Sequence, residues 1–353
     1  MQNYTFLTRR QYFETLVSLI DQASADQPVY VVTMTFDPSQ PIIEALVAAL
    51  IRAAGRGVTV TLLVDAFNFL VMPNGILPGP RWLGTPYTSM RGGYAATYAA
   101  LERIRVAGGV YQILNEPTRR RVPFAGRSHI KAAIIGDQVL IGGCNLERPG
   151  DSDIMITWSD VKATHQLKDW FDKLVKRPYT VAAFGASDSI VTLHDTTQLL
   201  LDAGVPDQST IYDHALQLID DADEWLYITC QYFPGGPTAD HLAAAIKRGV
   251  AVTVTYSHPK AHGQAAFLYY YHQFMQRHRG LPTELFAHRM PASAPKLHAK
   301  ILSSEKTVLV GSHNYVRQGV RLGTAELALR VTDSAFIADL REFTQSLIGS
   351  VHL

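Results

Sequence analysis

Two distant stretches of the sequence repeat the same four polar side chains in the same order. Each set begins with a His, continues with a Lys two residues later and an Asn farther on, and ends with an acidic residue. The two sets are His129, Lys131, Asn145 and Asp153, and His298, Lys300, Asn314 and Glu326. The interval from His to Asn is the same in both sets. A pattern repeated this closely predicts a single composite site, with one set from each half of the chain.

Imidazole changes its charge readily near neutral pH, so two imidazoles in one site can take two roles. One would attack phosphorus to form a covalent phosphohistidine, while the other protonates the leaving alcohol and then activates water or a second alcohol. The Lys and Asn side chains would bind the phosphate oxygens. Asp153 and Glu326 would each hold a ring N–H of the His in their own set, as the third member of a catalytic triad does. We expect phosphodiester chemistry without a metal or cofactor.

The residues after each His-x-Lys pair predict a β-hairpin. A strand's period of two places His and Lys on one face and apolar residues on the other. Turn-forming residues follow at 136–137 and 303–306 and lead into a second apolar run. A single His-x-Lys pair on a strand is most often part of a solvated face, so the duplication is what favours a site. We interpret the glycines before each Asn as structural.

With these motifs the sequence resembles the phospholipase D superfamily, whose signature is two His-x-Lys motifs, each with a downstream Asn and acidic residue. It is most similar to the cardiolipin synthases and related phosphatidyltransferases. The resemblance implies that His129 is the nucleophile and His298 the general acid, with both Lys and both Asn residues binding phosphate. At a turn position where the family usually has Asp, this chain has Gly136 and Glu305, and we interpret that position as structural.

The two motifs belong to halves that repeat one order of elements. Residues 28–64 and 225–256 each read as strand, helix, strand, which is typical of a βαβ unit. We predict an α/β fold of two tandem phospholipase D-like α/β/α sandwich repeats, residues 1–185 and 186–353, joined around 177–196. An approximate two-fold axis would relate them, with the site at their interface. The helices expected to cover the sheets span 12–23, 41–56, 93–107, 163–174, 212–220, 238–248, 265–277 and 335–347.

Composition favours a folded protein with reduced thiols. The chain has 353 residues, of which 47% are hydrophobic, enough to bury a large core. The two cysteines, Cys144 and Cys230, lie in apolar runs and predict buried, reduced side chains. The sequence shows neither a signal peptide nor a membrane-spanning run. We therefore expect a monomeric cytoplasmic protein that contacts a membrane only peripherally.

The substrate must be inferred from the remaining surface. The formal net charge is only +1, whereas nucleases usually carry an excess of Lys and Arg. The basic cluster Arg119–Arg121, with Arg127, fits an anionic lipid headgroup, a DNA strand or a solvated loop. An apolar, proline-containing insertion from Phe67 to Leu83 suits a lid or a membrane contact. The aromatic segment 267–274 suits the same surface or base stacking, although we favour core packing for it.

These features favour a phosphatidyl-transferring or hydrolysing enzyme that acts on phospholipids. A metal-independent endonuclease is the alternative, and nucleic acid is the less favoured partner. A non-catalytic scaffold on the same fold is disfavoured because both sets of reacting side chains are complete. The sequence leaves open which phospholipid is used and whether water or an alcohol accepts the phosphatidyl group.

Overall fold

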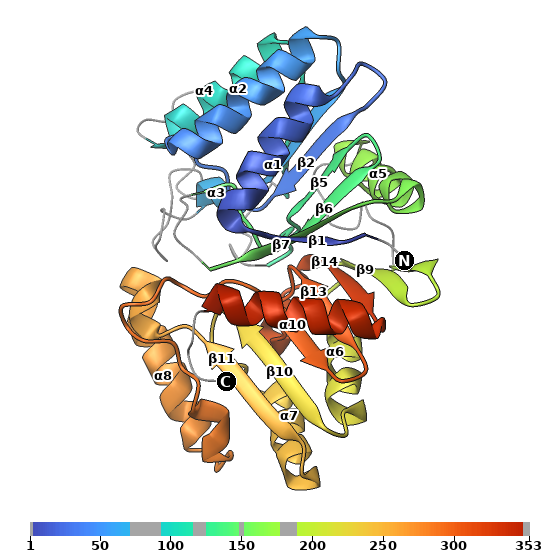
Figure 1. Cartoon of the computed structure of the whole chain (residues 1–353). Helices are drawn as coiled ribbons and strands as arrows, with labels where there is room; N and C mark the ends of the chain where they lie inside the picture. Colours follow the sequence, from blue (N-terminus) through green and yellow to red (C-terminus); the bar gives the residue numbers. More distant parts are fainter. Residues whose placement is uncertain (1–2, 71–92, 116–124, 148–151, 177–188, 349–353) are drawn as a thin grey trace.

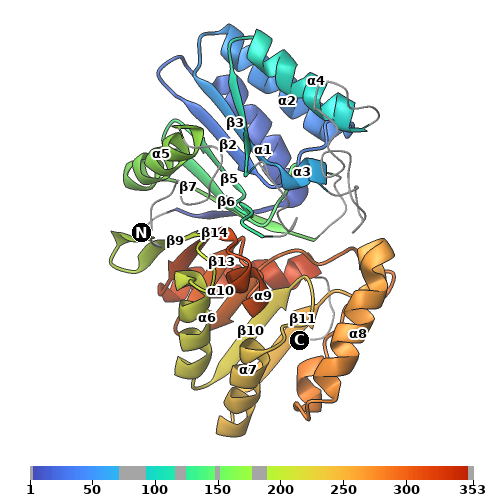
Figure 2. The same cartoon turned by 180° about the vertical axis from the view of Figure 1, so that it is seen from behind.

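The fold consists of two α/β halves that repeat one topology. The computed structural model describes residues 3–70, 93–115, 125–147, 152–176 and 189–348. Each half contains a seven-stranded mixed sheet, and helices flank both sheets (Figures 1 and 2). This arrangement confirms the expected pair of tandem α/β/α repeats.

The N-terminal sheet has the strand order β1-β7-β6-β5-β2-β3-β4. Its strands are β1 (Thr5–Thr8), β2 (Val29–Thr33), β3 (Val60–Asp65), β4 (Val110–Leu114), β5 (Ala132–Ile135), β6 (Gln138–Gly142) and β7 (Ile154–Ser159). β2, β3 and β4 pair in parallel, whereas β5 and β6 form the antiparallel hairpin predicted after the first motif. β7 and then β1 extend this antiparallel side of the sheet.

The C-terminal sheet has the order β11-β10-β12-β13-β14-β9-β8. Its strands are β8 (Ser189–His194), β9 (Thr197–Ala203), β10 (Trp225–Cys230), β11 (Ala251–Tyr256), β12 (Ile301–Ser304), β13 (Val308–Gly311) and β14 (Ala325–Val331). Starting at β9, the order β9-β14-β13-β12-β10-β11 matches the order β1-β7-β6-β5-β2-β3 of the N-terminal sheet. The hairpin β12–β13 corresponds to β5–β6, and the acid-bearing region around β14 corresponds to that around β7.

Every helix predicted from the sequence is present, within a few residues of its expected ends. The helices are α1 (Arg9–Gln22), α2 (Pro41–Gly55), α3 (Phe67–Leu70), α4 (Gly93–Val106), α5 (Val161–Lys176), α6 (Thr210–Asp221), α7 (Pro237–Arg248), η3 (Pro259–Ala265), α8 (Ala266–Arg277), η4 (Thr283–Phe286), α9 (Arg317–Arg321) and α10 (Ser334–Ile348). None of the described helices is both long enough and apolar enough to cross a membrane.

Local sequence signals explain where the crossover helices begin and end. α2 and α7 connect the parallel pairs β2–β3 and β10–β11, and each begins with a Pro, whose missing N–H costs no hydrogen bond in the first turn. α7 ends at Gly249, which has a φ of 94° that residues with side chains rarely adopt. The helices before these units begin at side-chain caps, Thr8 for α1 and Ser209 for α6. The same signals thus produce the same unit twice.

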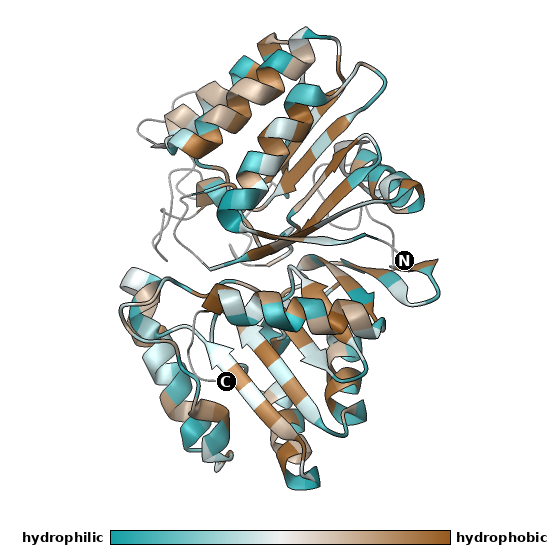
Figure 3. Cartoon of the chain, in the orientation of Figure 1, coloured by the Kyte–Doolittle hydropathy of each residue, from teal (hydrophilic) through white to brown (hydrophobic). Residues whose placement is uncertain are grey.

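The two halves are packed together through an apolar cluster that contains residues of both. Many residues of the strands are hydrophobic, coloured brown in Figure 3. Tyr4 and Phe6 at β1 make edge-on contacts with Phe336 of α10, at centroid distances of 4.8 and 5.2 Å. Trp158 of β7 and Leu199 of β9 belong to the same buried cluster. Because this core is continuous across the boundary, side chains from both halves can be held in one site.

Two predictions about chain segments need correction. The connection expected around 177–196 includes strand β8, so only part of it is a linker, and the predicted domain boundary after residue 185 lies outside the described residues.

In the apolar insertion, Phe69 and Leu70 are buried and pack in the N-terminal core. These two residues therefore cannot form the membrane contact expected of the Phe67 to Leu83 segment, and residues 71–83 lie outside the described part of the chain. Cys144 and Cys230 are both buried and form no disulfide within the described part of the chain, as predicted.

Candidate active site

The two His-x-Lys motifs lie just before β5 and β12, rather than inside these strands as the sequence predicted. Each strand begins at the residue after the Lys. The two entry segments pair across the boundary with the opposite half. The N–H of His129 donates to the carbonyl oxygen of Ala325 (2.8 Å), and the N–H of His298 donates to that of Ser152 (2.8 Å). This exchange of backbone hydrogen bonds places both motifs where the two halves meet.

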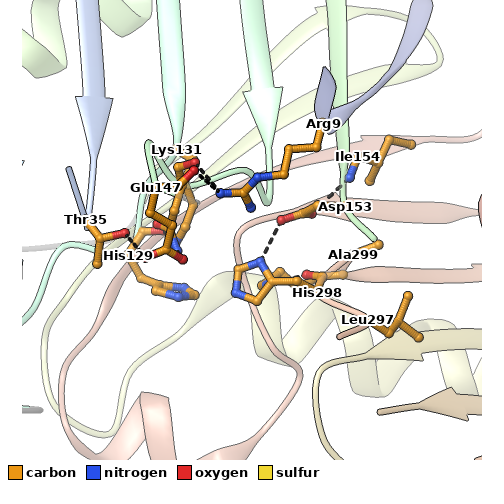
Figure 4. A network of polar contacts seen from close by, with 12 residues as sticks. Arg9, Thr35, His129, Lys131, Glu147, Asp153, Ile154, Leu297, His298 and Ala299 are labelled. Atoms are coloured by element: carbon orange, nitrogen blue, oxygen red, sulfur yellow. Dashed lines mark hydrogen bonds and ion pairs between the residues drawn. The ribbon is translucent and has the colours of Figure 1, made fainter. Parts of the chain in front are cut away.

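Each imidazole is held by the acidic residue of the other set. Nδ1 of His129 lies 3.0 Å from Oε2 of Glu326. Nδ1 of His298 lies 2.6 Å from Oδ2 of Asp153, a contact drawn in Figure 4. The predicted pairing of each acid with the His of its own set is therefore wrong. The backbone exchange explains the difference, because the two residues that accept the motif N–H groups immediately precede the two acids in the sequence.

Burial lowers the pKa of both imidazoles, but their surroundings differ. For His129 the charge of Glu326 opposes the effect of burial. For His298 the charges of Lys300 and other nearby cations act in the same direction as burial, and the pKa lies well below its usual value. Both rings are thus neutral at pH 7, and because Nδ1–H donates to a carboxylate, Nε2 carries the lone pair. Figure 4 shows the two rings next to each other.

The carboxylate of Glu326 stays ionised throughout the physiological pH range. Burial alone would raise its pKa, but the charge and hydrogen bond of His129 outweigh burial and bring the pKa to about 2. Asp153 is fully buried, and its second oxygen accepts the backbone N–H of Ile154 at 2.9 Å. Both acids can therefore hold the tautomer of the imidazole that each contacts.

Two buried ammonium groups accompany the imidazoles. Nζ of Lys131 donates to the carbonyl oxygen of His129 at 2.7 Å, and Nζ of Lys300 donates to that of His298. Burial, followed by the charge of Lys300, lowers the pKa of Lys131 to about 7. The site therefore concentrates positive charge that a bound anion would stabilise. An ammonium has three N–H donors, so binding one carbonyl leaves Lys131 able to donate to phosphate as well.

The two Asn side chains have buried oxygens that the fold does not use. Nδ2 of Asn145 lies 3.3 Å from a carboxylate oxygen of Glu147. Within the described residues, Oδ1 of Asn145 and Oδ1 of Asn314 have no hydrogen-bond partner, although buried polar atoms normally have one. Such amides suit a polar ligand. A side chain at Gly142 or Gly311 would overlap a backbone carbonyl of the neighbouring strand, which confirms that these glycines are structural.

Sequence reasoning missed three residues around the first set. The Arg9 guanidinium donates to the backbone oxygens of Asn145 (2.9 Å) and Glu147 (3.0 Å), and thus fixes the segment that carries the Asn. The hydroxyl of Thr35 donates to Oε2 of Glu147 at 2.8 Å (Figure 4). Glu147 could have been suspected from its place two residues after Asn145, whereas no pattern in the sequence identifies Arg9 or Thr35.

Two further residues of the second set also escaped prediction, although they directly precede its Asn. The hydroxyl of Ser312 donates to Oε2 of Glu326, the same oxygen that holds His129. The neighbouring His313 is buried, and its Nδ1 accepts the backbone N–H of Tyr315 at 2.9 Å. Burial lowers the pKa of His313 to about 4, so a third neutral imidazole lies behind the reacting groups.

Arg127 lies in neither the ligand groove nor the solvated loop that the sequence left open for it. Its guanidinium is buried, with Nη1 3.4 Å from Oδ1 of Asp65 and 3.0 Å from the backbone oxygen of Asn115. Oδ2 of Asp65 accepts the backbone N–H of Ser128 at 2.7 Å. This buried ion pair therefore fixes the start of the first motif. Arg119–Arg121 lie outside the described residues.

The turn positions that depart from the family pattern have a structural role, as interpreted. Gly136 has a φ of 57°, which favours glycine. The carboxylate of Glu305 accepts the backbone N–H groups of Asp223 (2.9 Å) and Trp225 (3.2 Å). Neither position contacts the imidazoles, so the departure leaves the reacting groups in place.

A family model described as "Cardiolipin synthase, PLD-like domain" matches residues 16–175 and 215–348. These segments make up more than half of the chain and contain both motifs. The chain belongs to the phospholipase D superfamily. The membership predicted from the two motifs is thus confirmed.

Solved structures support the fold. The phosphatidylserine synthase of Haemophilus influenzae superposes with a TM-score of 0.72 at 14% identity, covering 98% of this chain and 86% of that one. Polyphosphate kinase from Porphyromonas gingivalis has a TM-score of 0.56 at 11% identity, covering 99% of this chain and 51% of that one. At such low identities these likenesses concern the fold alone. No curated protein matches the chain.

Proposed function

We propose that this protein transfers or hydrolyses the phosphatidyl group of phospholipids through a covalent phosphohistidine. The observation that supports this most strongly is the crossed pair of imidazole–carboxylate contacts, His129 with Glu326 and His298 with Asp153. Because each half supplies the acid for the other, neither half alone holds an oriented imidazole. An arrangement that depends on both halves suits a reaction that needs two imidazoles at once.

The first step is in-line attack on phosphorus. Nε2 of His129 forms the P–N bond while the P–O bond to the leaving alcohol breaks, and His298 gives its Nε2 proton to the departing oxygen. His298 must acquire this proton beforehand. The anionic diester, bound beside the two rings, raises their pKa toward the values needed for that. Lys131, Lys300 and the two Asn amides stabilise the charge on the non-bridging oxygens.

The second step reverses the roles. Nε2 of His298 takes a proton from water or from an acceptor alcohol, whose oxygen attacks phosphorus as the P–N bond breaks. His129 is thereby regenerated, and the product is a phosphatidic acid or a new phospholipid. The assignment of His129 as nucleophile follows the family resemblance, since the crossed contacts give both rings the same geometry.

A phospholipid substrate is supported by the family description and by the fold shared with a phosphatidylserine synthase. The test is incubation of the protein with phosphatidylglycerol vesicles, with and without an added alcohol, followed by lipid mass spectrometry. We expect phosphatidic acid or a headgroup-exchanged phospholipid, and neither product with His129→Ala. Cleavage of single-stranded DNA without turnover of any phospholipid would instead identify the endonuclease alternative.

A further inference from the structure

Helix α8 turns its apolar side chains outward and its polar side chains inward. Its buried residues are Gln273 and Gln276, and the ring of His272 lies 3.0 Å from the backbone oxygen of Phe233. Its large apolar residues are exposed, with Phe267 60% and Tyr271 64% accessible. The exposed set is Phe267, Leu268, Tyr270, Tyr271, Phe274 and Met275. A helix that packs only against its own protein has the opposite orientation, so this surface, here called the α8 face, is suited to an external apolar partner.

The expectation that this aromatic helix packs into the core is therefore wrong. Its apolar residues were correctly recognised, but the hydrogen bonds of the loop after β10 determine which side faces inward. A side chain at Gly235 would overlap the ring of His272, so the polar side of α8 lies directly against this loop. Figures 1 and 2 both show α8 at the outer edge of the C-terminal half.

The charge around α8 is strongly one-sided. Between residues 241 and 304 the sequence has a single acidic residue, Glu284, against eight basic residues, although the whole chain has a net charge of only +1. Arg279 is paired with Asp240 at 2.7 Å. Lys260 and Arg277, at the two ends of the helical segment, form no ion pair with any described carboxylate, and Arg277 lies 4.6 Å from the ring of Phe286. An apolar face with basic residues at its ends complements an anionic lipid surface.

Contacts on the inner side of α8 extend toward the candidate active site. Tyr269, on the inner side of α8, stacks on His262 at 3.8 Å and on Tyr232 at 5.5 Å. Tyr232 follows β10. Burial raises the pKa of Tyr232, and the charges of Tyr269 and then of Glu326 raise it further. In both views the N-terminal end of α8 lies near the boundary between the halves, where the motifs meet. The N-terminal end of α8 is therefore the end of the helix that lies nearer to the candidate site.

We infer that the α8 face docks on the surface of an anionic phospholipid bilayer, with Phe267, Tyr271 and Phe274 inserted among the lipids. This inference rests on the proposed function, since it describes how that site reaches a lipid substrate. At a membrane interface, Phe and Tyr side chains place their rings among the acyl chains, and the Tyr hydroxyl lies among the headgroups. A second copy of the chain is a poorer occupant, because a symmetric contact through this face would bring like charges together.

The test is flotation of the whole protein with phosphatidylcholine vesicles, with and without phosphatidylglycerol. We expect binding to the anionic vesicles and a loss of about tenfold or more in the partition coefficient for Phe267→Ala/Tyr271→Ala/Phe274→Ala. The matched control is Val106→Ala/Val161→Ala, which removes exposed apolar side chains elsewhere and should bind like the wild type. Lys260→Glu/Arg277→Glu should weaken binding to anionic vesicles at low salt.

Four outcomes would overturn the inference. The first is a wild-type protein that does not bind anionic vesicles, and the second is a triple variant that binds them as well as the wild type does. The third is a wild-type dimer in sedimentation velocity that the triple variant converts to a monomer. The fourth is a triple variant that loses affinity for a single-stranded oligonucleotide while keeping its vesicle binding.

Turnover of the water-soluble diester bis(para-nitrophenyl) phosphate separates this inference from the proposed function. The triple variant should cleave the soluble diester at the wild-type rate, because the α8 face is distinct from the reacting groups. Vesicle binding by a protein that cleaves no diester would refute the proposed function and leave the docking surface standing. Cleavage of phospholipid by a protein whose α8 variants bind vesicles normally would support the proposed function and refute the docking surface.

Discussion

The two sets of site residues have the same geometry, but different neighbouring residues hold their acidic side chains. In the first, Gly143 leaves room for Asp153, whose second oxygen, Oδ1, accepts the backbone N–H of Ile154. In the second, Ser312 stands in place of that glycine and its hydroxyl donates to Glu326. Glu147, which follows the first Asn, corresponds to Val316 in the second half. The repeat thus preserves the His, Lys, Asn and acidic residues of the candidate site, while the residues that contact them have diverged.

This difference separates the two imidazoles chemically. Burial and nearby Lys charges lower the pKa of both rings, but for His129 the charge of Glu326 offsets part of this effect, whereas the pKa of His298 lies well below its usual value. Two rings in one site can therefore differ in proton affinity even though both point Nδ1 at a carboxylate. In the free protein His129 is therefore the more basic ring, which suits a nucleophile, whereas His298 can act as an acid only once a bound diester raises its pKa.

The largest effect is expected from removing either imidazole. His129→Ala and His298→Ala should each lower phospholipid turnover by about 10⁴-fold or more. With bis(para-nitrophenyl) phosphate, whose leaving group needs no acid, the two variants should differ. His298→Ala should still release one equivalent of nitrophenol in a burst, and His129→Ala should release none. Identical behaviour of the two variants in stopped-flow measurements would mean that the rings do not have separate roles.

Gly143→Ala should impair the first set severely. Its Cβ would overlap Oδ1 of Asp153 and displace the carboxylate that holds His298, so we expect turnover to fall by about 10²-fold or more. Gly55→Ala is the matched control, because a Cβ there meets no atom within 4 Å. Wild-type kcat in a correctly folded Gly143→Ala protein, checked by circular dichroism, would show that Asp153 can shift without consequence.

Ser312→Ala tests the corresponding position of the second set, with a smaller expected effect. It removes one hydrogen bond to a charged carboxylate, so kcat should fall about tenfold while KM changes little. Ser312→Thr keeps the hydroxyl and should restore most of the activity. If Ser312→Ala and Ser312→Thr lower kcat equally, the hydroxyl does not support Glu326.

The smallest effect concerns stability rather than turnover. Because the pKa of His313 is about 4 in the folded protein and its ordinary value is 6.5, the unfolded chain binds more protons between these pH values, and stability falls as the pH drops through this window. His313→Asn retains an acceptor for the N–H of Tyr315. It should reduce the decrease in Tm from pH 7 to pH 4 by roughly a few degrees. An unchanged decrease would show that His313 does not contribute to it.

The sequence predicted the elements, and the two sets of polar residues that the fold brings together, because these depend on local patterns. Strand–helix–strand units, helix ends and the repeated motif spacing are all encoded within short segments. The crossed contacts were missed because spacing along the chain says nothing about which half accepts the N–H of His129. Arg127 was misjudged because its buried partner, Asp65, is distant in sequence.

The orientation of α8 was missed for a related reason. Its apolar and polar stripes are clear in the sequence, and burying the apolar stripe is the usual outcome. The polar stripe is buried instead because the ring of His272 contacts the backbone oxygen of Phe233 in the loop after β10. Such a contact depends on how α8 follows β11 in space, which short-range patterns do not specify.

The central claim, that each acid serves the imidazole of the other half, is tested most directly by peptide-mapped mass spectrometry of the trapped intermediate. The para-nitrophenyl ester of phosphatidic acid would be used as substrate, because its leaving group needs no acid. We predict that Asp153→Asn forms the phosphatidyl adduct on His129 at the wild-type rate and retains it, whereas Glu326→Gln forms it slowly. The reverse pattern, with fast labelling of His129 in Glu326→Gln and slow labelling in Asp153→Asn, would contradict the crossed arrangement.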